Sequence, residues 1–165
     1  MRPSFDDVPE TRRRNMAAIR GKDTKPEVAV RRALHALGYR FRLHRADLPG
    51  RPDIVFPSRR IAIEVRGCFF HWHGCANSVL PKSRTEWWRQ KLDGNLTRDT
   101  QNEVALIALG WRLLVVWECN VRQDLAGAVD NLVSVLGPAG SVLTRSRPAN
   151  TDFPSSGSPA RGKET

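Results

Sequence analysis

The spacing of apolar positions predicts helices in several parts of the chain. Between Thr24 and Gly38 the apolar residues recur every three to four positions, as on one face of a helix. Thr24 can cap this helix, Glu27 can close a capping box with it, and Gly38 can end it. Three further helices are expected, over residues 11–20, over residues 84–109 with Gly94 as a point where the helix could break, and over residues 125–136.

Four other segments have the length and composition of β-strands. Residues 39–43 alternate apolar and basic side chains, and residues 53–56 and 61–65 are short apolar runs joined by a turn. Residues 112–117 form a continuous apolar run, which predicts a central strand buried on both faces. The order of these elements predicts an α/β fold, in which a mixed sheet is covered by helices on both sides.

Composition divides the chain into an arm, a domain and a tail. Residues 1–22 are expected to form a basic arm, and residues 23–138 a domain that contains an aperiodic loop at 66–83. Residues 139–165, rich in Ser, Pro, Gly, Arg and Thr, are expected to be disordered. The first ten residues lack the apolar stretch of a secretory signal, and no run approaches the roughly 20 residues of a membrane helix. We therefore expect a cytoplasmic protein.

The charge of the chain favours a polyanionic partner. Its 165 residues include 27 Lys and Arg against 17 Asp and Glu, which gives a formal net charge of +10 and a pI of about 10.7. Such a basic domain gains affinity for nucleic acid by releasing the counterions condensed on phosphates. An evenly solvated basic surface is the alternative, and charge alone favours nucleic acid over it.

A cluster of cysteines and histidines suggests a zinc site. Cys68, His71, His73 and Cys75 lie within eight residues, and Cys119 follows the apolar run at 112–117. Three thiolates and one imidazole make a closed tetrahedral zinc set, so spacing leaves one of the two histidines over. Buried cysteines that act as small hydrophobic side chains are the alternative, but they explain poorly why both histidines lie beside them.

Two carboxylates suggest a second, catalytic metal. Asp53 opens one predicted strand, and Glu64 lies on the next strand, two residues before Arg66. Metal-dependent nucleases place Mg²⁺ on carboxylates in such an arrangement, because the ion prefers oxygen ligands and can activate a water. Asp53 could instead be an ordinary turn residue after proline.

Aromatic residues gather in the aperiodic loop and the helix start that follows it. Ordinary core packing is expected for one residue of the pair Trp87 and Trp88. Phe69 and Phe70, between a cysteine and a histidine, are harder to bury and suit an apolar wedge that enters a base step of DNA.

The combined motifs resemble the very-short-patch-repair (Vsr) DNA mismatch endonuclease family in the order in which they occur over residues 11–122. This family resemblance is carried by Arg14-Asn15-Met16, Arg20-Gly21-Lys22-Asp23-Thr24 with Glu27, Asp47-Leu48-Pro49-Gly50-Arg51-Pro52-Asp53, Gly67-Cys68-Phe69-Phe70-His71, Arg84-Thr85-Glu86-Trp87-Trp88, Lys91 with Asn95, Arg98-Asp99, and Gly110-Trp111 through Trp117-Glu118-Cys119.

The resemblance implies a restriction-endonuclease-like fold and a Mg²⁺-dependent nick 5′ of the mispaired T in a T·G mismatch, which arises by deamination of 5-methylcytosine. Asp53 and the backbone carbonyl of Val65 would bind Mg²⁺, and His71 would be the catalytic histidine. Glu27 would lie near the metal-bound water or simply close its capping box. The remaining four residues would bind structural Zn²⁺: Cys68, His73, Cys75 and Cys119.

The resemblance also implies how the enzyme would meet DNA. Phe69, Phe70 and Trp88 would enter the duplex beside the mismatch from the major groove. Met16 and Ile19 would do so from the minor groove. Lys91 and Asn95 would read the mispaired bases, and a poorly stacked wobble pair is easier to open than a matched one. A monomer that acts on the bacterial nucleoid, with mismatch-repair proteins as further partners, is the implied setting.

Three residues depart from the family pattern. Phe70 stands where the family usually has Trp, and this smaller wedge should still intercalate. Glu64 and Arg66 stand where the family usually has other residue types, and Glu64-Val65-Arg66 resembles the triplet of general restriction nucleases. Glu64 could be a second Mg²⁺ ligand with Arg66 as a phosphate clamp, or the two could be an idle ion pair. The alternatives to mismatch nicking are therefore a restriction-type endonuclease with another target and a zinc-stabilised DNA-binding protein without catalysis.

Overall fold

The fold is a four-stranded mixed sheet between two layers of helices, seen in a computed structural model that describes residues 9–11, 14 and 21–140. The main elements, in chain order, are α2 (Lys25–Ala36), β1 (Arg42–Leu43), β2 (Ile54–Phe56), the 3-10 helix η1 (Pro57–Arg59), β3 (Ile61–Arg66), α3 (Thr85–Ala108), β4 (Arg112–Trp117), α4 (Glu118–Gln123) and α5 (Leu125–Leu136). None of the helices described combines the length and apolar character needed to cross a bilayer.

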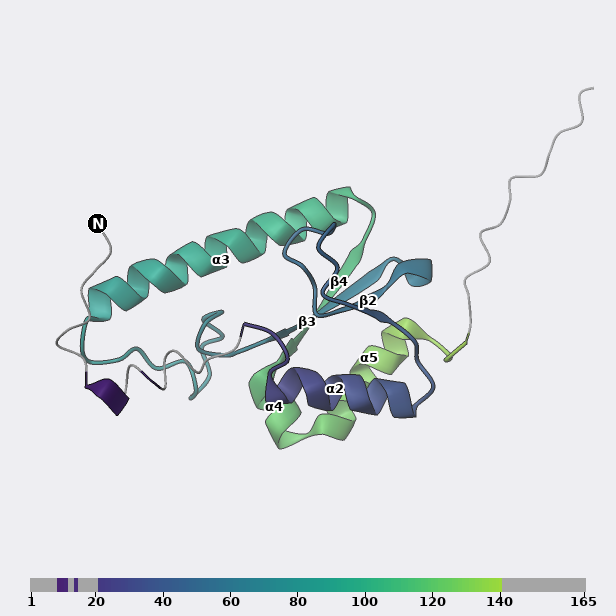
Figure 1. The fold of residues 1–165 in the computed structure, drawn as a ribbon, viewed down its shortest axis with the longest axis horizontal. Coiled ribbons are helices and arrows are strands. Elements are labelled where there is room, and N and C mark those ends of the chain that lie inside the picture. The colour runs from purple at the N-terminus through teal and green to yellow at the C-terminus, as the bar shows by residue number, and fades with distance from the viewer. Residues whose placement is uncertain (1–8, 12–13, 15–20, 141–165) are drawn as a thin grey trace, which may run out of the picture.

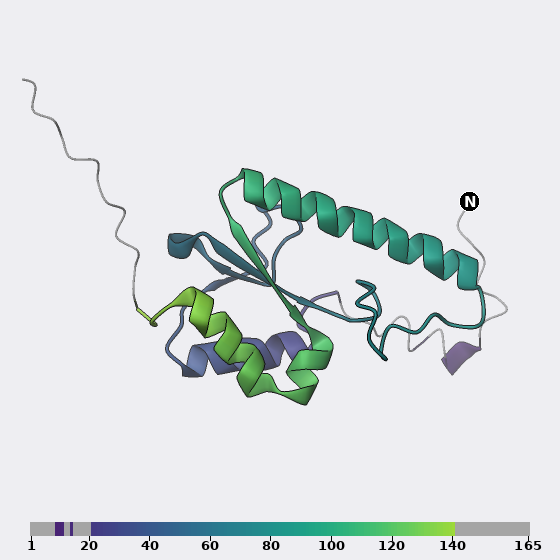
Figure 2. The same cartoon turned by 180° about the vertical axis from the view of Figure 1, so that it is seen from behind.

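The sheet has the order β1-β2-β3-β4, with antiparallel pairing from β1 to β3 and parallel pairing of β3 with β4. Helix α3 lies on one face, and α2, α4 and α5 lie together on the other (Figures 1 and 2). The predicted α/β fold, a mixed sheet with helices on both sides, is therefore confirmed. The N-terminal half of α3 extends past the sheet, above the loop that connects β3 to α3 (Figure 1).

Strand alternation gives each face of the sheet its own hydrophobic core. Ile54 and Phe56 pack with α2 and α5 in the larger core, whereas Val55 between them packs with Leu106 of α3 in the smaller one. Because both faces of β2 are covered, all three of its residues are buried. The sheet is thereby held firmly at the strand ends where Asp53 and Val65 lie.

The prediction that residues 112–117 form a central strand is wrong. β4 stands at the edge of the sheet, pairs with β3, and has Val116 as its one fully buried residue. Helices flank both faces of this edge strand, so its sequence is as apolar as that of a central strand. A continuous apolar run indicates that both faces of a strand are covered by other elements. It does not indicate whether the strand has one or two neighbouring strands in the sheet.

The helices follow the predicted boundaries closely, with one exception. Helix α2 begins after Thr24, and α5 spans the predicted residues 125–136. The break expected at Gly94 is wrong, because α3 continues through it from Thr85 to Ala108. A single glycine costs a helix only about 1 kcal/mol, which the rest of a long helix can offset.

Two elements differ from the prediction, and two predicted segments lie outside the described residues. The strand expected at 39–43 is reduced to Arg42 and Leu43, and the short helix α4 was not predicted. The helix expected at 11–20 falls almost entirely outside the described residues, as does the tail beyond residue 140.

Candidate active site and metal centre

Asp53 lies at the entry to β2, beside the end of β3. Antiparallel pairing sets Ile54 opposite Ile63, so Asp53 comes next to the last residues of β3. The backbone N–H of Val65 donates a hydrogen bond of 2.7 Å to Asp53 Oδ2. The sheet register therefore brings together the two residues that the resemblance implied as Mg²⁺ ligands.

The Asp53 carboxyl is largely shielded from solvent. Burial raises its pKa above the ordinary value, while the Val65 N–H and the nearby charges of His44, Arg31 and His71 lower it in part. A nearby cation stabilises the charged form of a carboxylate that is poorly solvated. Asp53 and His71 also lie close enough to act on one another electrostatically.

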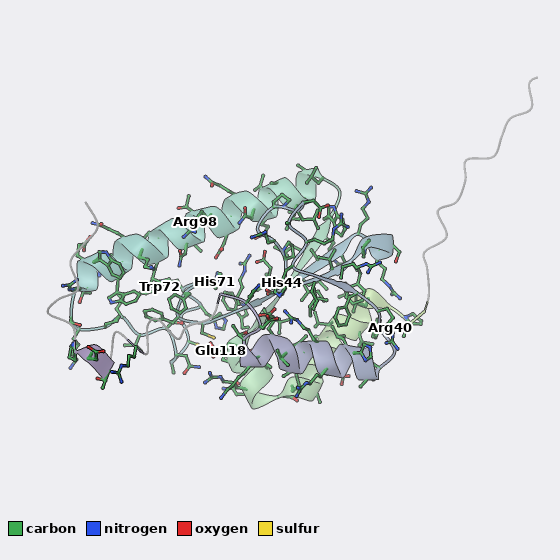
Figure 3. The ribbon with its side chains drawn as sticks, viewed as in Figure 1. Arg40, His44, His71, Trp72, Arg98 and Glu118 are labelled. Atoms are coloured by element: carbon green, nitrogen blue, oxygen red, sulfur yellow. The ribbon has the colours of Figure 1, made fainter. Side chains whose placement is uncertain are left out.

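His71 is paired with an acid of helix α3. Its Nδ1 lies 2.6 Å from Oδ2 of Asp99, and both side chains are half-buried. A carboxylate on one ring nitrogen orients the imidazole and leaves the other nitrogen for chemistry. No role was assigned to Asp99 from the sequence. A catalytic histidine generally has a carboxylate partner, so the prediction for His71 was a signal that could have led to Asp99. Figure 3 shows His71 in the middle of the molecule, beneath α3.

Glu27 takes part in two arrangements at once. Its Oε2 accepts from the Thr24 backbone N–H at 3.1 Å and closes the capping box of α2. Its Oε1 is ion-paired with Arg31 and lies 3.2 Å from Nε2 of His44. The side chain is only 2% exposed, so this buried acid both caps the helix and faces the site.

A group of charged residues around Glu27 was missed in the sequence. Arg31 lies 2.6 Å from Asp23 Oδ1 and 2.7 Å from His44 Nε2. His44 Nδ1 in turn lies 3.8 Å from Asp53 Oδ1. Residues from α2 and from the end of β1 are thus linked to the start of β2. His44 follows a strand of only two residues, which gave no periodicity to mark it.

Glu64 and Arg66 form an ion pair with each other. Arg66 Nε and a terminal guanidinium nitrogen each lie 2.8 Å from Glu64 Oε2. Burial raises the pKa of Glu64 above its ordinary value, Arg66 lowers it, and Asp53 and Asp99 raise it further. The two residues lie near the site, but their charges are directed at each other, as expected for an idle pair.

Four of the five predicted zinc-type residues come together, and His71 is the one that lies elsewhere. One ligand atom from each of Cys68, His73, Cys75 and Cys119 falls within 4.8 Å of all the others. Helix α4 carries Cys119 into the group from the end of β4. The His73 ring stacks on Trp117 with centroids 4.1 Å apart, which orients it toward the cysteines. This group could hold one tetrahedral metal ion.

The cysteines differ in how readily they ionise. The backbone N–H of Asn77 lowers the pKa of the Cys75 thiol to about 6, so that it is mostly thiolate at neutral pH. Burial raises the pKa of Cys68 to about 12 without a cation nearby. A metal ion would bind the thiolate of Cys75 readily and would supply the charge that Cys68 needs in order to ionise.

The aromatic residues of the loop pack against the start of α3. Phe69 contacts Phe70 and Trp88 edge-to-face, with ring centroids 5.1 Å and 5.2 Å away. Trp87 lies beside Trp88, and all four rings are half-buried. The expectation that Trp87 or Trp88 belongs to the core is therefore wrong, because this part of α3 extends past the sheet.

Further residues implied in DNA contact lie along the same part of α3. Lys91 lies over the Trp87 ring, and the Asn95 amide donates to the Phe70 carbonyl at 3.0 Å. Asn95 therefore ties the loop to α3. Met16 and Ile19 lie outside the described residues.

Comparison with known proteins agrees with the sequence resemblance. Residues 6–77 match the family model described as DNA mismatch endonuclease Vsr. The chain is 53% identical over 131 residues to the type II nicking enzyme V.XorIIP of Xanthomonas oryzae pv. oryzae, covering 79% of this chain and 96% of the relative. It is 44% identical over 112 residues to the DNA mismatch endonuclease Vsr of Escherichia coli, covering 68% and 72%. It is also 44% identical over 124 residues to the type II nicking enzyme V.NaeI of Lentzea aerocolonigenes, covering 72% and 74%.

Proposed function

Since the chain belongs to the Vsr family of DNA mismatch endonucleases and is a DNA nicking nuclease, we propose that it nicks duplex DNA immediately 5′ of the mispaired T in T·G mismatches. The observation that carries this proposal is the convergence of Asp53, held by Val65, with the His71–Asp99 pair. The nick would start the short-patch repair of deaminated 5-methylcytosine.

The site around Asp53 suits Mg²⁺ in its donor chemistry. Mg²⁺ is usually held by one or two carboxylates and keeps several waters, and it takes substrate phosphate oxygens as ligands. Asp53 and the Val65 carbonyl would supply the protein oxygens, and the buried Asp53 carboxylate needs a cation. Glu64 stays a candidate second ligand, although its ion pair with Arg66 competes for it. The bound ion would activate a water and neutralise charge on the scissile phosphate.

His71 is the residue best placed to move a proton. Asp99 holds its Nδ1, which leaves Nε2 free to act as acid or base toward a phosphate oxygen or water. Glu27, through Oε1, would help to orient groups on the Asp23 and His44 side of the site. Removing a general acid or base of this kind typically lowers a rate by 10²–10⁴-fold.

The surface near this site suits DNA. Phe69, Phe70 and Trp88 form one partly exposed aromatic cluster, which could be inserted beside a mismatch as a wedge. Lys91 and Asn95 follow on the same helix and would contact the mispaired bases. Opening a wobble pair needs less energy than opening a matched pair, so the wedge itself would favour mismatches.

The four-residue cluster at the end of β4 is proposed to bind Zn²⁺. Three sulfur atoms and one imidazole nitrogen leave no open coordination position, which is typical of structural zinc. The ion would fasten the loop that carries His71 to the sheet. Zinc would thus act on catalysis only by ordering the loop.

A strand-resolved nicking assay tests the function. Matched T·G and T·A duplexes, each labelled on one strand at a time, are incubated with the protein with and without Mg²⁺. We expect one nick, in the T strand of the T·G duplex, only with Mg²⁺. Asp53→Ala and His71→Ala should bind the T·G duplex but nick it at least ~10²-fold more slowly.

The alternatives give different products in the same assay. Equal nicking of T·A, or cleavage of both strands, would indicate a restriction-type endonuclease and end the mismatch proposal. Binding without a nick on any duplex would indicate a DNA-binding protein without catalysis. Wild-type rates for Asp53→Ala would show that the metal lies elsewhere.

A further inference from the structure

His44 occupies the space between the buried carboxylate of Glu27 and the half-buried carboxylate of Asp53, both of which the proposed function uses. On one side its Nε2 lies 3.2 Å from Glu27 Oε1, and on the other its Nδ1 lies 3.8 Å from Asp53 Oδ1. Its backbone N–H also donates to the Asp53 carbonyl at 3.4 Å. His44 is therefore joined to the proposed Mg²⁺ ligand through both its main chain and its ring. Figure 3 shows it in the middle of the molecule, between α3 and α2.

Arg31 determines which ring nitrogen of His44 carries hydrogen. A terminal guanidinium nitrogen of Arg31 lies 2.7 Å from His44 Nε2. Glu27 Oε1 at 3.2 Å and Asp23 Oδ1 at 3.5 Å also lie near this nitrogen, but the guanidinium is the nearest of the three. Guanidinium groups only donate hydrogen bonds, so we assign Nε2 as the acceptor. With Nε2 as the acceptor, the N–H of the ring lies on Nδ1, the nitrogen that faces Asp53.

Arg31 is itself fixed in place. It is ion-paired with Asp23 at 2.6 Å and with Glu27, and its side chain is 12% exposed. The guanidinium lies among Asp23, Glu27 and His44, three side chains whose ligand atoms would otherwise suit a metal ion. The protein's own cation thus fills this position and aligns His44.

The backbone of His44 is in an unfavourable conformation that contacts with other residues must stabilise. Its φ of 45° is in the left-handed region, which residues other than glycine enter only at an energetic cost. The turn directs the ring into the charged cluster instead of leaving it to continue β1. Strain of this kind persists where surrounding contacts hold it, and here those contacts come from Arg31, Glu27 and Asp53.

We propose that His44 is a positioning residue for the nicking reaction, whose Nδ1–H, fixed by Arg31, holds the Asp53 carboxylate in the orientation that binds the divalent ion. This inference rests on the proposed function, in which Asp53 is the metal ligand. The distance of 3.8 Å exceeds that of a direct hydrogen bond, and catalytic contacts of this kind commonly tighten when ion and substrate bind. His44 then acts on the ion through Asp53.

The test compares two substitutions that both tolerate the left-handed backbone. His44→Gly removes the ring, whereas His44→Asn keeps an N–H donor at about the position of Nδ1. Mn²⁺ binding is followed by electron paramagnetic resonance on the zinc-loaded protein bound to nicked T·G product. Mg²⁺ dependence of nicking is measured in parallel, with Asp53→Ala alongside.

We expect His44→Gly to weaken Mn²⁺ binding by about 10- to 100-fold, as is usual when the partner of a metal ligand is lost. The Mg²⁺ concentration for half-maximal nicking should rise similarly, while DNA affinity and zinc content stay unchanged. His44→Asn should restore Mn²⁺ binding toward the wild-type value.

Wild-type Mn²⁺ affinity in His44→Gly would overturn the inference, as would equal losses in His44→Gly and His44→Asn. A different result would contradict the proposed function, namely wild-type Mn²⁺ binding and nicking in Asp53→Ala. The two failures are thus distinguishable.

Discussion

Asp53 shows how a single half-buried carboxyl couples folding to metal binding. Burial is the largest influence on it and raises its pKa above the ordinary value of an aspartate. A carboxyl whose pKa is raised on folding stabilises the protein fully below its unfolded pKa, and this contribution is lost as pH rises through the folded pKa. At neutral pH the charged Asp53 therefore destabilises the metal-free fold.

Asp53→Asn should make the Mg²⁺-free protein more stable than wild type at pH 7. Asparagine stays neutral, and its oxygen can still accept the Val65 N–H. The advantage should shrink as pH falls from 7 toward 4, because the raised pKa of Asp53 makes a growing fraction of the wild-type carboxyl protonated over that range. Urea unfolding of the zinc-loaded proteins at both pH values measures this difference.

Added Mg²⁺ supplies the internal control for that comparison. The ion should raise the free energy of unfolding of the wild type and leave Asp53→Asn unchanged, because binding stabilises only the state that binds. Equal stability of the two proteins at both pH values, with and without Mg²⁺, would contradict this account of Asp53.

Helix α3 connects the body of the protein with the part proposed to meet DNA. Its C-terminal half packs on the sheet through Leu106, while its N-terminal half carries Trp88, Lys91 and Asn95 past the sheet (Figure 2). The projecting half gains little from core packing. Its helical conformation must therefore rely more on intrinsic propensity and on contacts with the loop.

Gly94→Ala should stabilise the protein by about 1 kcal/mol, because alanine favours a helix over glycine. Gly94 is exposed, and an added Cβ would meet no heavy atom within 4 Å. Thermal or urea unfolding measures the change, with Gly50→Ala as the matched control. At Gly50 the φ is +72° and a Cβ would approach Asn102 to 3.0 Å, so that substitution should destabilise. A loss of stability in Gly94→Ala would mean that α3 needs flexibility there.

Over the whole molecule, the cysteine and histidine cluster joins two distant parts of the chain. Cys68, His73 and Cys75 belong to the loop after β3, and Cys119 belongs to α4 after β4. A metal ion at this cluster would close the segment between them, which contains all of α3. Both His71 and the aromatic wedge would depend on that closure for their position.

Cys119→Ser should release zinc and lower the free energy of unfolding by more than ~4 kcal/mol, the range typical of losing a structural metal. Zinc content is measured by atomic absorption and stability by urea unfolding. His71→Ala is the matched control, because this histidine lies in the same loop but outside the four-residue cluster. It should keep one zinc per chain and lose nicking. Zinc loss in His71→Ala with retention in Cys119→Ser would reverse the assignment.

The local features of this protein could be predicted from its sequence. The capping box of Thr24 and Glu27 and the apolar period of residues 125–136 depend on neighbours within one or two helical turns, and these two predicted helices were confirmed. The motifs that resemble the Vsr family also identified the family, because they are short and run in a fixed order.

Long-range geometry was decided only by the tertiary structure. Strand order placed β4 at an edge, the approach of α3 set Asp99 against His71, and the turn after β1 put His44 between Glu27 and Asp53. Cysteine and histidine spacing left two histidines for one position; the family resemblance implied His73, and the folded loop places His73 with the cysteines. These contacts join residues far apart in the chain, and no local period or cap records which distant surfaces will pack together. Composition could therefore indicate the chemistry, while packing selected which side chains face one another.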